Sequence, residues 1–384
     1  SPDSRTSALA YNRSLISSGQ GNGYHLLLDV PQQYGSHRTV QFNAGRDRKR
    51  RAGRKIGRKR VPGRKKGKSL ESEDHVRFLV FAIVCIMLMA QFADGNEYFV
   101  SIQGDDGHDG ASRGSAFRTV QRGVDALAAG DTLTILPGQY NETVRREGLG
   151  NAGTDTLIQA DLAGTVVLRG DVPAPKFAKQ DGYRFVYAAS FEQMPVTVFE
   201  RDTLAALDER LNITDLEFRP GSFYYDQQAQ KLYISPSDLQ PPAAHKYMVS
   251  LHSASGLRLD NSHRVTIKGV AATGYYPEDD KAHRFAEHVS GIMLNDSDRC
   301  RIVQCTAFLN GNGITAVGGR RIVIERCHAY GNGTRRHAPS GNIVRFNCNE
   351  DVIRDCISYA STGNGSGFQF YAGATGPMLY EGNI

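Results

Sequence analysis

Two stretches in the second half of the sequence concentrate the side chains that could carry out catalysis. Residues 274–290 read GYYPEDDKAHRFAEHVS, and residues 330–340 read YGNGTRRHAPS. Between them they supply carboxylates, imidazoles, an ammonium group and guanidinium groups. The residues of interest are Asp279, Asp280, Lys281, His283, Arg284, Glu287, His288, Arg335, Arg336 and His337.

Two reactions fit these residue types. In β-elimination on a uronic-acid polymer, a base removes the proton next to a carboxylate while cations or Ca²⁺ stabilise the enolate charge. Lys281 or His337 could be the base, with Arg258, Arg336 or Arg345 as the cations.

Glycoside hydrolysis is the alternative, and it needs two carboxylates that flank the scissile bond. Asp279, Asp280, Glu287 and Asp260 are the available acids. Each of these charged residues could instead belong to a solvated loop surface.

The elements that must position these stretches are repetitive. From Gly256 onward the chain divides into units that begin at Gly256, Gly291, Gly313, Gly341 and Gly367. Each unit has two short stretches of alternating apolar residues separated by turn residues, which indicates strands with one buried face. Short strands that repeat roughly every 20 to 30 residues, with no helical pattern between them, predict a parallel β-solenoid.

Stacked coils bring equivalent positions together. Both catalytic stretches precede the first strand of a coil, two rungs apart, so about 10 Å should separate them at ~4.8 Å per rung. The outward positions of the first strands should form one face for a polymer. They include Arg258, Asp260, Met293, Asn295, Thr315, Arg345, Gln369 and Tyr371, although a one-residue slip at Arg345 would turn it inward. We expect Arg258, Asp260, His283, His288, Arg345, Gln369 and Tyr371 to bind substrate.

Two further sets of residues recur at equivalent positions of the coils. Cys305, Cys327 and Cys356 are expected to form a ladder of buried thiols rather than a metal or catalytic site. Asn310, Asn312, Asn332 and Asn364 recur beside glycines and are expected to be turn residues or a hydrogen-bonded ladder.

The start of the folded region carries a family resemblance. Residues 98–144 include AFRTVQRGVDALAAGDTLTILPGQY, which resembles the "PF-x-T-I-Q-x-A" helix and "GD-x-V-x-x-x-x-G-x-Y" strand that open right-handed parallel β-helix proteins of the pectate-lyase-like superfamily. Ala116 stands where that pattern has proline. The resemblance implies an all-β, right-handed parallel β-helix with an N-terminal capping helix. Phe117, Val120, Val124 and Leu127 indeed share one helical face.

Residues 171–250 interrupt the coil rhythm and are predicted to be an inserted β-rich region. Within them PGSFYYDQQAQKLYIS predicts a hairpin, and it is similar to a "G-x-W-Y-Y-D … L-Y-V" segment of carbohydrate-active β-helix proteins. The superfamily includes lyases, hydrolases, epimerases and non-enzymatic surface proteins. The resemblance therefore implies a polysaccharide partner. The cationic residues of the two stretches, over a groove on such a fold, favour polysaccharide lyase over glycoside hydrolase or a non-catalytic adhesion role.

The family's calcium and catalytic motifs are missing from the sequence, so no catalytic residue is carried over. Asp105, Asp106 and Asp109 could hold Ca²⁺ through oxygen ligands, but a turn is the expected role. His283 and His288 do not have the spacing of a zinc helix, and no metal site is predicted.

The charge distribution separates a basic head from a mildly acidic body. Residues 1–95 hold 18 Lys/Arg against 7 Asp/Glu, a net of +11, which leaves 28 against 33 and a net of −5 for the rest. A nucleic-acid partner is therefore not expected for the folded part, because phosphate binding needs a basic surface. Residues 1–74 are predicted to be a disordered basic extension or an over-long start.

Residues 75–95 are predicted to be a signal-type segment. The uncharged run FLVFAIVCIMLMA at residues 78–90 is too short for a membrane span of ~20 residues, so the membrane would be involved only if this segment stays uncleaved. We expect a secreted, cell-surface or periplasmic monomer. Residues 96–170 should hold the cap and first coils, and residues 251–384 the later coils. The chain ends inside a coil, so we expect the natural coils to continue.

Overall fold

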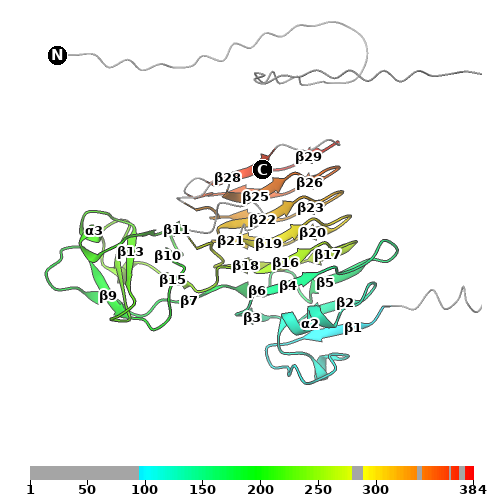
Figure 1. Ribbon diagram of the computed structural model, residues 1–384, viewed down its shortest axis with the longest axis horizontal. Helices are drawn as coiled ribbons and strands as arrows, with labels where there is room; N and C mark the ends of the chain where they lie inside the picture. Colours follow the sequence, from blue (N-terminus) through cyan, green and yellow to red (C-terminus); the bar gives the residue numbers. More distant parts are fainter. Residues whose placement is uncertain (1–94, 279–288, 335–339, 363–364, 372–376) are drawn as a thin grey trace, which may run out of the picture. The chain divides into compact units, whose positions relative to one another are not determined.

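Three wholly parallel sheets wind into a parallel β-helix, which confirms the predicted fold type (Figure 1). The computed structural model describes residues 95–278, 289–334, 340–362, 365–371 and 377–384. Sheet 1 consists of β4 (Val144–Glu147), β16 (Leu257–Asp260), β19 (Ser290–Asn295), β22 (Asn312–Val317), β25 (Ser340–Phe346) and β28 (Gly365–Tyr371).

The other two sheets complete the walls of the coils. Sheet 2 consists of β1 (Glu97–Val100), β2 (Thr132–Ile135), β5 (Thr156–Ala160), β17 (Val265–Lys268), β20 (Arg301–Val303), β23 (Val323–Glu325), β26 (Val352–Arg354) and β29 (Leu379–Glu381). Sheet 3 consists of β3 (Gly138–Tyr140), β6 (Val166–Arg169), β18 (Val270–Thr273), β21 (Thr306–Phe308), β24 (His328–Tyr330) and β27 (Ile357–Tyr359).

Each later coil contains three strands, where the sequence pattern predicted two. The expected second strand is divided by one residue with left-handed backbone, and the residues at this corner are Gly269, Gln304, Arg326 and Asp355, with φ of 74°, 54°, 53° and 55°. The apolar alternation continues through the corner, so it does not reveal the bend between sheets 2 and 3.

The interior of the coils is one continuous apolar core that includes the thiols. Cys305, Cys327 and Cys356 are at most 1% exposed and lie in this core, which confirms the predicted ladder. Cys300 and Cys348 are also buried, and all five cysteines in the described part of the chain are free. Burial raises the pKa of the Cys305 thiol to about 12, as expected for a thiol that acts as a small apolar side chain.

Asparagines form a second ladder at the corner between sheets 3 and 1. The Asn310 amide nitrogen donates to Asn332 Oδ1 at 3.0 Å, and the Asn332 amide nitrogen donates to Asn342 Oδ1 at 2.8 Å. The predicted ladder is therefore present for Asn310 and Asn332. Its next member is Asn342, while the predicted member Asn364 lies outside the described residues.

Helix α2 (Val120–Ala126) packs at the β1 end of the stack (Figure 1). Its residues Val120 and Val124 are buried in the core of the coils. The Thr119 side chain caps its first turn by accepting from Arg122 N, and the Glu142 carboxylate accepts from two further backbone N–H groups of that turn. A 3₁₀ turn, η1 (Arg113–Ser115), precedes it.

The inserted region consists of two small sheets. One contains β7 (Asp171–Pro173), β10 (Thr197–Glu200), β11 (Ala205–Ala206) and β15 (Tyr247–Ser250). The other contains β8 (Ala178–Lys179), β9 (Tyr187–Ser190), β12 (Asp208–Glu209), β13 (Ser222–Asp226) and β14 (Lys231–Ser235). Strands β13 and β14 form the predicted hairpin, with Phe223 opposite Ile234 and Tyr225 opposite Leu232. The helices are α3 (Ile213–Glu217) and the 3₁₀ turn η2 (Pro242–Ala244).

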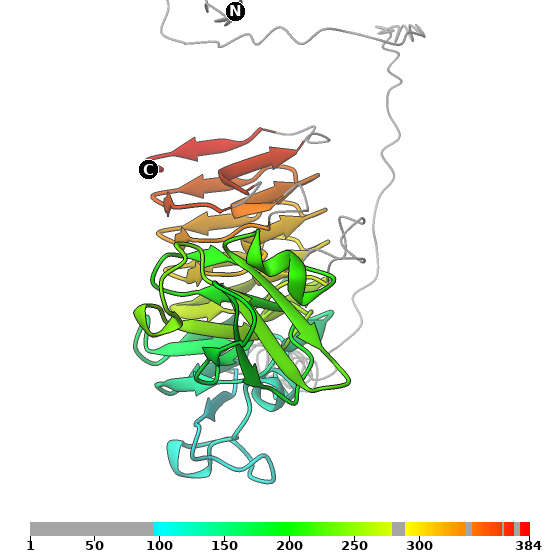
Figure 2. The same cartoon turned by 90° about the vertical axis from the view of Figure 1, so that its left-hand side faces the viewer.

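The insert leaves the coils at the corner between sheets 3 and 1, since it connects β6 to β16. The two long connections predicted to hold catalytic residues start and end at the same corner, from β18 to β19 and from β24 to β25. Phe199 and Met248 of the insert pack against Tyr276 and Leu309 of the coils. Figure 2 shows the insert in front of the coils, so it covers one side of the stack.

No helix in the described part of the chain is long and apolar enough to cross a membrane. The predicted signal-type segment and the basic extension lie outside the described residues.

Candidate functional site

The outer face of sheet 1 carries two columns of side chains. Leu257 and Leu259 of β16 point into the core, so the alternate residues Arg258 and Asp260 point outward, as predicted. By strand register, the first column is Arg145, Arg258, Met293, Thr315, Val344 and Gln369. The second is Glu147, Asp260, Asn295, Val317, Phe346 and Tyr371.

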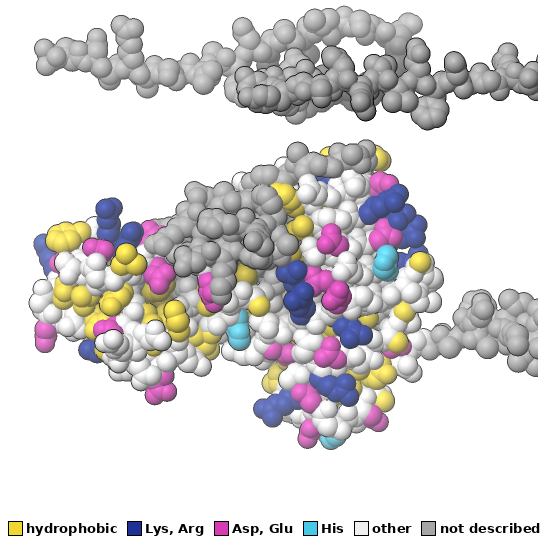
Figure 3. Space-filling model, in the orientation of Figure 1, with side chains coloured by type: hydrophobic (Ala, Val, Ile, Leu, Met, Phe, Trp, Pro, Cys, Tyr) yellow, Lys and Arg dark blue, Asp and Glu magenta, His cyan; other side chains and the backbone are white. Residues whose placement is uncertain are grey.

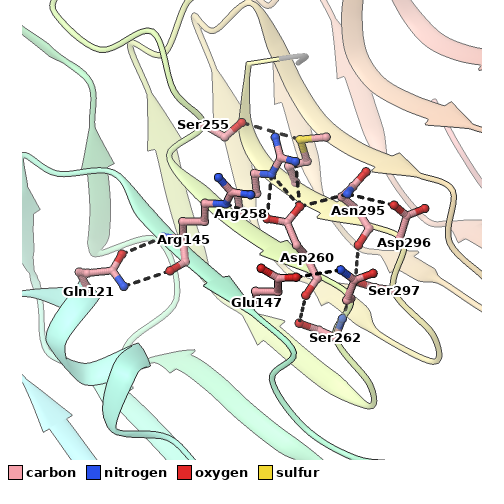
Figure 4. Close-up of polar contacts among 12 residues, drawn as sticks. Gln121, Arg145, Glu147, Ser255, Arg258, Asp260, Ser262, Asn295, Asp296 and Ser297 are labelled. Carbon is pink, nitrogen blue, oxygen red and sulfur yellow. Dashed lines mark hydrogen bonds and ion pairs between the residues drawn. The ribbon is translucent and has the colours of Figure 1, made fainter. Parts of the chain in front are cut away.

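Asp260 is the centre of a polar network that spans three rungs of this face (Figure 4). Its carboxylate accepts hydrogen bonds from Arg145 Nε at 2.8 Å, from Arg258 Nε at 2.8 Å and from the Asn295 amide at 3.1 Å. The Asp260 side chain is only 4% exposed, while that of Arg145 is 67% exposed. The network therefore holds two guanidinium groups side by side over a buried carboxylate.

The Asp260 carboxylate is held in its ionised form. Burial raises its pKa, but the hydrogen bonds and charges of Arg258 and Arg145 outweigh burial, and the net pKa lies below its ordinary value. A carboxylate that is ionised and saturated with donors is poorly suited to act as a general acid. Its role in this arrangement is to position the two arginines.

Arg145 was missed by the sequence analysis. Its strand, β4, has the sequence VRRE and is separated from β16 in the chain by two coil strands and the whole insert. A signal was nevertheless present in the sequence. VRRE of β4 pairs residue by residue with LRLD of β16, so Arg145 and Glu147 take the same outward positions as Arg258 and Asp260.

The middle of the face is apolar rather than charged. Met293, Val317 and Phe346 form a buried cluster on the outer side of sheet 1. Thr315 lies in the neighbouring column, fully buried, and its hydroxyl contacts Ser290 Oγ at 2.8 Å. The polar network thus occupies the β4–β16–β19 end of the face. Figure 3 shows acidic and basic side chains interspersed on the visible side of the coils.

The prediction that Arg345 points outward to bind substrate is wrong. Strand β25 pairs with β22 so that Arg345 lies opposite Ala316 on the inner face, while Val344 and Phe346 take the outward positions. Asn342 stands opposite Gly313, so the coil that begins at Gly341 is one residue out of the repeat. Arg345 is 2% exposed and pairs with the buried Asp351.

Gln369 and Tyr371 lie on the last described strand of sheet 1. Gln369 lies opposite Val344, and Tyr371 lies opposite Phe346, so both have the outward positions that were predicted. They lie four rungs from Arg258 and Asp260 on β16, so the two sets are far apart along the face. The side chain of Tyr371 lies outside the described residues.

The predicted catalytic residues lie outside the described residues. These are Asp279, Asp280, Lys281, Glu287, Arg336 and His337, together with the predicted substrate-binding residues His283 and His288. The described strands nevertheless fix where both connections enter the face, at β19 and β25, with β22 between them.

The acidic turn before α2 has a structural use. Asp106 accepts from the backbone N–H groups of Arg118 and Thr119, and Asp109 accepts from Ala111 N and the Ser115 hydroxyl. Asp105 accepts from Gly107 N. These bonds build the turn. Among the described residues, no group of three or more His, Cys, Asp or Glu side chains is placed to hold a metal ion.

Comparison with known proteins finds likeness in structure only. No family model matches the chain, and no curated protein matches it. One similar solved structure is a glycoside hydrolase, at 12% identity and a TM-score of 0.49 over 70% of this chain and 74% of that one. Another is XylC in complex with xylose, at 13% identity and a TM-score of 0.44 over 75% and 65%.

A third is an alginate lyase from Paenibacillus sp. str. FPU-7, at 12% identity and a TM-score of 0.38 over 69% of this chain and 62% of that one. At these values the likeness assigns no activity, and the fold rests on the three sheets described above.

Proposed function

We propose that this protein is exported and acts on a uronic-acid-containing polysaccharide, as a polysaccharide lyase whose substrate lies at the β4–β16–β19 end of the outer face of sheet 1. The observation that carries the proposal is the pair of guanidinium groups, Arg145 and Arg258, held by Asp260 on the outer face of a stacked parallel sheet. A polymer with a carboxylate on each sugar presents regularly spaced anions, which such a pair can bind.

The chemistry follows from the charges. Elimination builds negative charge on the uronate carboxylate as the neighbouring proton leaves, and fixed cations at that carboxylate lower the barrier. Arg145 and Arg258 would supply these cations. The base is proposed to be Lys281 or His337, from the two connections that enter the face at β19 and β25.

Glycoside hydrolysis is the alternative on the same face. Asp260 is ionised and shared between two arginines, so it is a poor general acid. Hydrolysis would therefore need acids from the two connections, which are Asp279, Asp280 or Glu287. This difference favours the lyase. A non-catalytic polysaccharide-binding role would use the same arginines without a base.

The remaining proposals concern the chain outside the site. The coils are proposed to wind right-handed with α2 closing the β1 end, supported by the opening motif and by the burial of Val120 and Val124 against the first strands. Export is proposed from the uncharged run at residues 78–90. The polymer is the proposed partner, and a monomer is the proposed state.

The test is an absorbance assay near 235 nm, the band of unsaturated uronates, on the full chain with pectate, alginate and glycosaminoglycans, with and without Ca²⁺. A rise that is lost in Lys281→Ala or His337→Ala supports elimination. New reducing ends without a rise would replace the lyase by a hydrolase. Neither product, together with retained polymer binding, would leave only the binding role.

A further inference from the structure

The inserted region contains a cavity of about 610 Å³ that is remote in sequence from the sheet 1 network. It is lined by the segment that follows β7, by the turn after β10, and by η2 and the start of β15. Backbone hydrogen bonds tie these segments together, from Ala174 N to Tyr247 O at 3.0 Å and from Arg201 N to Lys246 O at 2.8 Å. The cavity walls are therefore held by the antiparallel ladder of the insert.

Three cationic side chains line this cavity, Lys176, Arg201 and Lys246. Glu200 pairs with Tyr247 in the antiparallel ladder of β10 and β15. The next pair of residues along this ladder is Arg201 and Lys246, which therefore lie directly opposite each other. Like charges in directly opposite positions of a sheet are destabilising. None of the three forms an ion pair with another residue in the described part of the chain.

The carboxylates nearby are already engaged by other donors. Glu200 is fully buried and accepts from the Tyr247 hydroxyl at 2.9 Å and from Ser237 N at 2.9 Å. Asp202 contacts His245 Nδ1 at 2.9 Å, and Asp238 contacts His245 Nε2 at 3.1 Å, so two carboxylates share one imidazole. These acids fix the walls of the cavity. The charge of Arg201 also acts on Asp171, a carboxylate that already pairs with Arg169, so an external anion would be held mainly by Lys176 and Lys246 together with the outer side of Arg201.

The cavity also presents an apolar wall. The rings of Phe177 and Tyr247 pack edge to face, with centroids 5.6 Å apart at 78°. The Tyr247 hydroxyl donates to Glu200, which fixes the position of the ring, and Pro242, which also lines the cavity, is buried. Figure 3 shows hydrophobic side chains gathered on the insert. Aromatic and proline faces suit the C–H face of a sugar ring, while fixed cations suit its carboxylate.

We propose that this cavity is a second binding site for acidic oligosaccharides, separate from sheet 1, with Arg201 and Lys246 on the sugar carboxylates and the half-buried Phe177 against a ring. The proposal rests on the proposed function for the class of ligand, but it places binding at residues that take no part in cleavage. Such a site would hold the polymer, or an end of it, while the coils act on another stretch.

The test uses calorimetric titration of the full chain with galacturonate trisaccharide, with oligomannuronate, and with a hyaluronan tetrasaccharide. The methyl ester of the galacturonate trisaccharide serves as the neutral ligand of the same shape. We expect at least one acidic ligand to bind, the ester to bind at least tenfold more weakly, and Arg201→Ala/Lys246→Ala to weaken acidic binding at least tenfold. The control Arg219→Ala/Lys231→Ala removes the same two charges from the same region and should change binding less than twofold.

The outcomes separate this inference from the proposed function. Cleavage at 235 nm with unchanged binding in the Arg201→Ala/Lys246→Ala variant overturns the second site alone. Binding that depends on Arg201 and Lys246 without any cleavage supports the site and overturns the lyase. Absence of binding to every acidic ligand, or equal binding of acid and ester, overturns the second site.

Discussion

Arg345 and Asp351 form an ion pair inside the coil, with Nε 2.9 Å from Oδ2 and both side chains 2% exposed. Arg345 takes the inward position that Leu259, Leu294 and Ala316 hold in the preceding coils. Asp351 accepts from Ile322 N at 3.3 Å and lies one rung beyond it. Charged groups thus replace two apolar ones in the core of one coil.

Breaking this pair should destabilise the protein strongly. We expect Asp351→Ala to lower the free energy of unfolding by about 3–5 kcal/mol, because the buried guanidinium loses its ion pair with the Asp351 carboxylate. The apolar double variant Arg345→Met/Asp351→Val should recover most of this loss. Urea unfolding followed by circular dichroism measures both. If the double variant loses as much stability as Asp351→Ala, the broken ion pair is not the cause of the loss. The control is Arg320→Ala, which breaks the exposed pair with Glu350 and should lower the free energy of unfolding by less than about 1 kcal/mol.

The stability contributed by Asp260 should depend on pH in a defined direction. Its pKa is lowered, so its contribution is complete above the ordinary value near 4 and is lost as the pH falls through the lowered pKa. At pH 7, Asp260→Asn should cost about 1.5–3 kcal/mol, since hydrogen bonds to a charged group are lost. The difference from the unmodified protein should shrink as the pH drops below about 4. A difference that grows on acidification would contradict the assignment.

The arginines of the network should matter more for activity than for folding. We expect Arg258→Ala to reduce kcat/KM on the cleaved polymer roughly 100-fold, as for a lost donor to a developing anion. Arg145→Ala should act in the same direction, and it should lower the melting temperature less than Arg258→Ala does, because the Arg145 side chain is 67% exposed and that of Arg258 only 20%. The 235 nm assay measures the rates. The matched control is Arg320→Ala, in the turn between β22 and β23. Equal rates in all three variants would remove the network from the site.

The thiols of Cys300, Cys305 and Cys348 should be inert in the folded protein. The pKa of Cys300 and of Cys348 is raised by burial to about 11, and that of Cys305 to about 12, while reaction with alkylating agents needs the thiolate. Iodoacetamide at pH 8 should leave these cysteines unmodified until guanidinium unfolds the chain. Peptide mass spectrometry reads the modification site by site. Rapid labelling of Cys305 under native conditions would show that its coil opens.

The parallel β-helix and its thiol ladder could be predicted because the repeat is carried by residue types. Three cysteines at one position of successive coils, beside recurring glycines, require stacking whatever the details of each strand. The hairpin of the insert was equally visible, since Phe223, Tyr225, Leu232 and Ile234 alternate around a turn.

Register was harder to predict than architecture. One extra residue before Ile343 moves Arg345 to the inner face. The inner positions of the other coils are apolar, so the sequence pattern does not predict a charged side chain there. The corner at Gln304 was also invisible, because a polar residue in the left-handed conformation is unusual and its neighbours keep their alternation. Arg145 escaped for another reason: its contact with Asp260 joins residues 115 apart in the chain.

The corners of the coil differ in how much chain they admit. From sheet 2 to sheet 3 the later coils turn on one left-handed residue, such as Gln304 or Arg326, so added chain there would push the thiol ladder out of line. From sheet 3 to sheet 1 the same coil accepts anything from a short turn to the whole insert without disturbing the rungs. The corner between sheets 3 and 1 is therefore where the fold takes up the longest added segments, beside the outer face of sheet 1. Segments could be exchanged at this corner while the stacked coils keep their register.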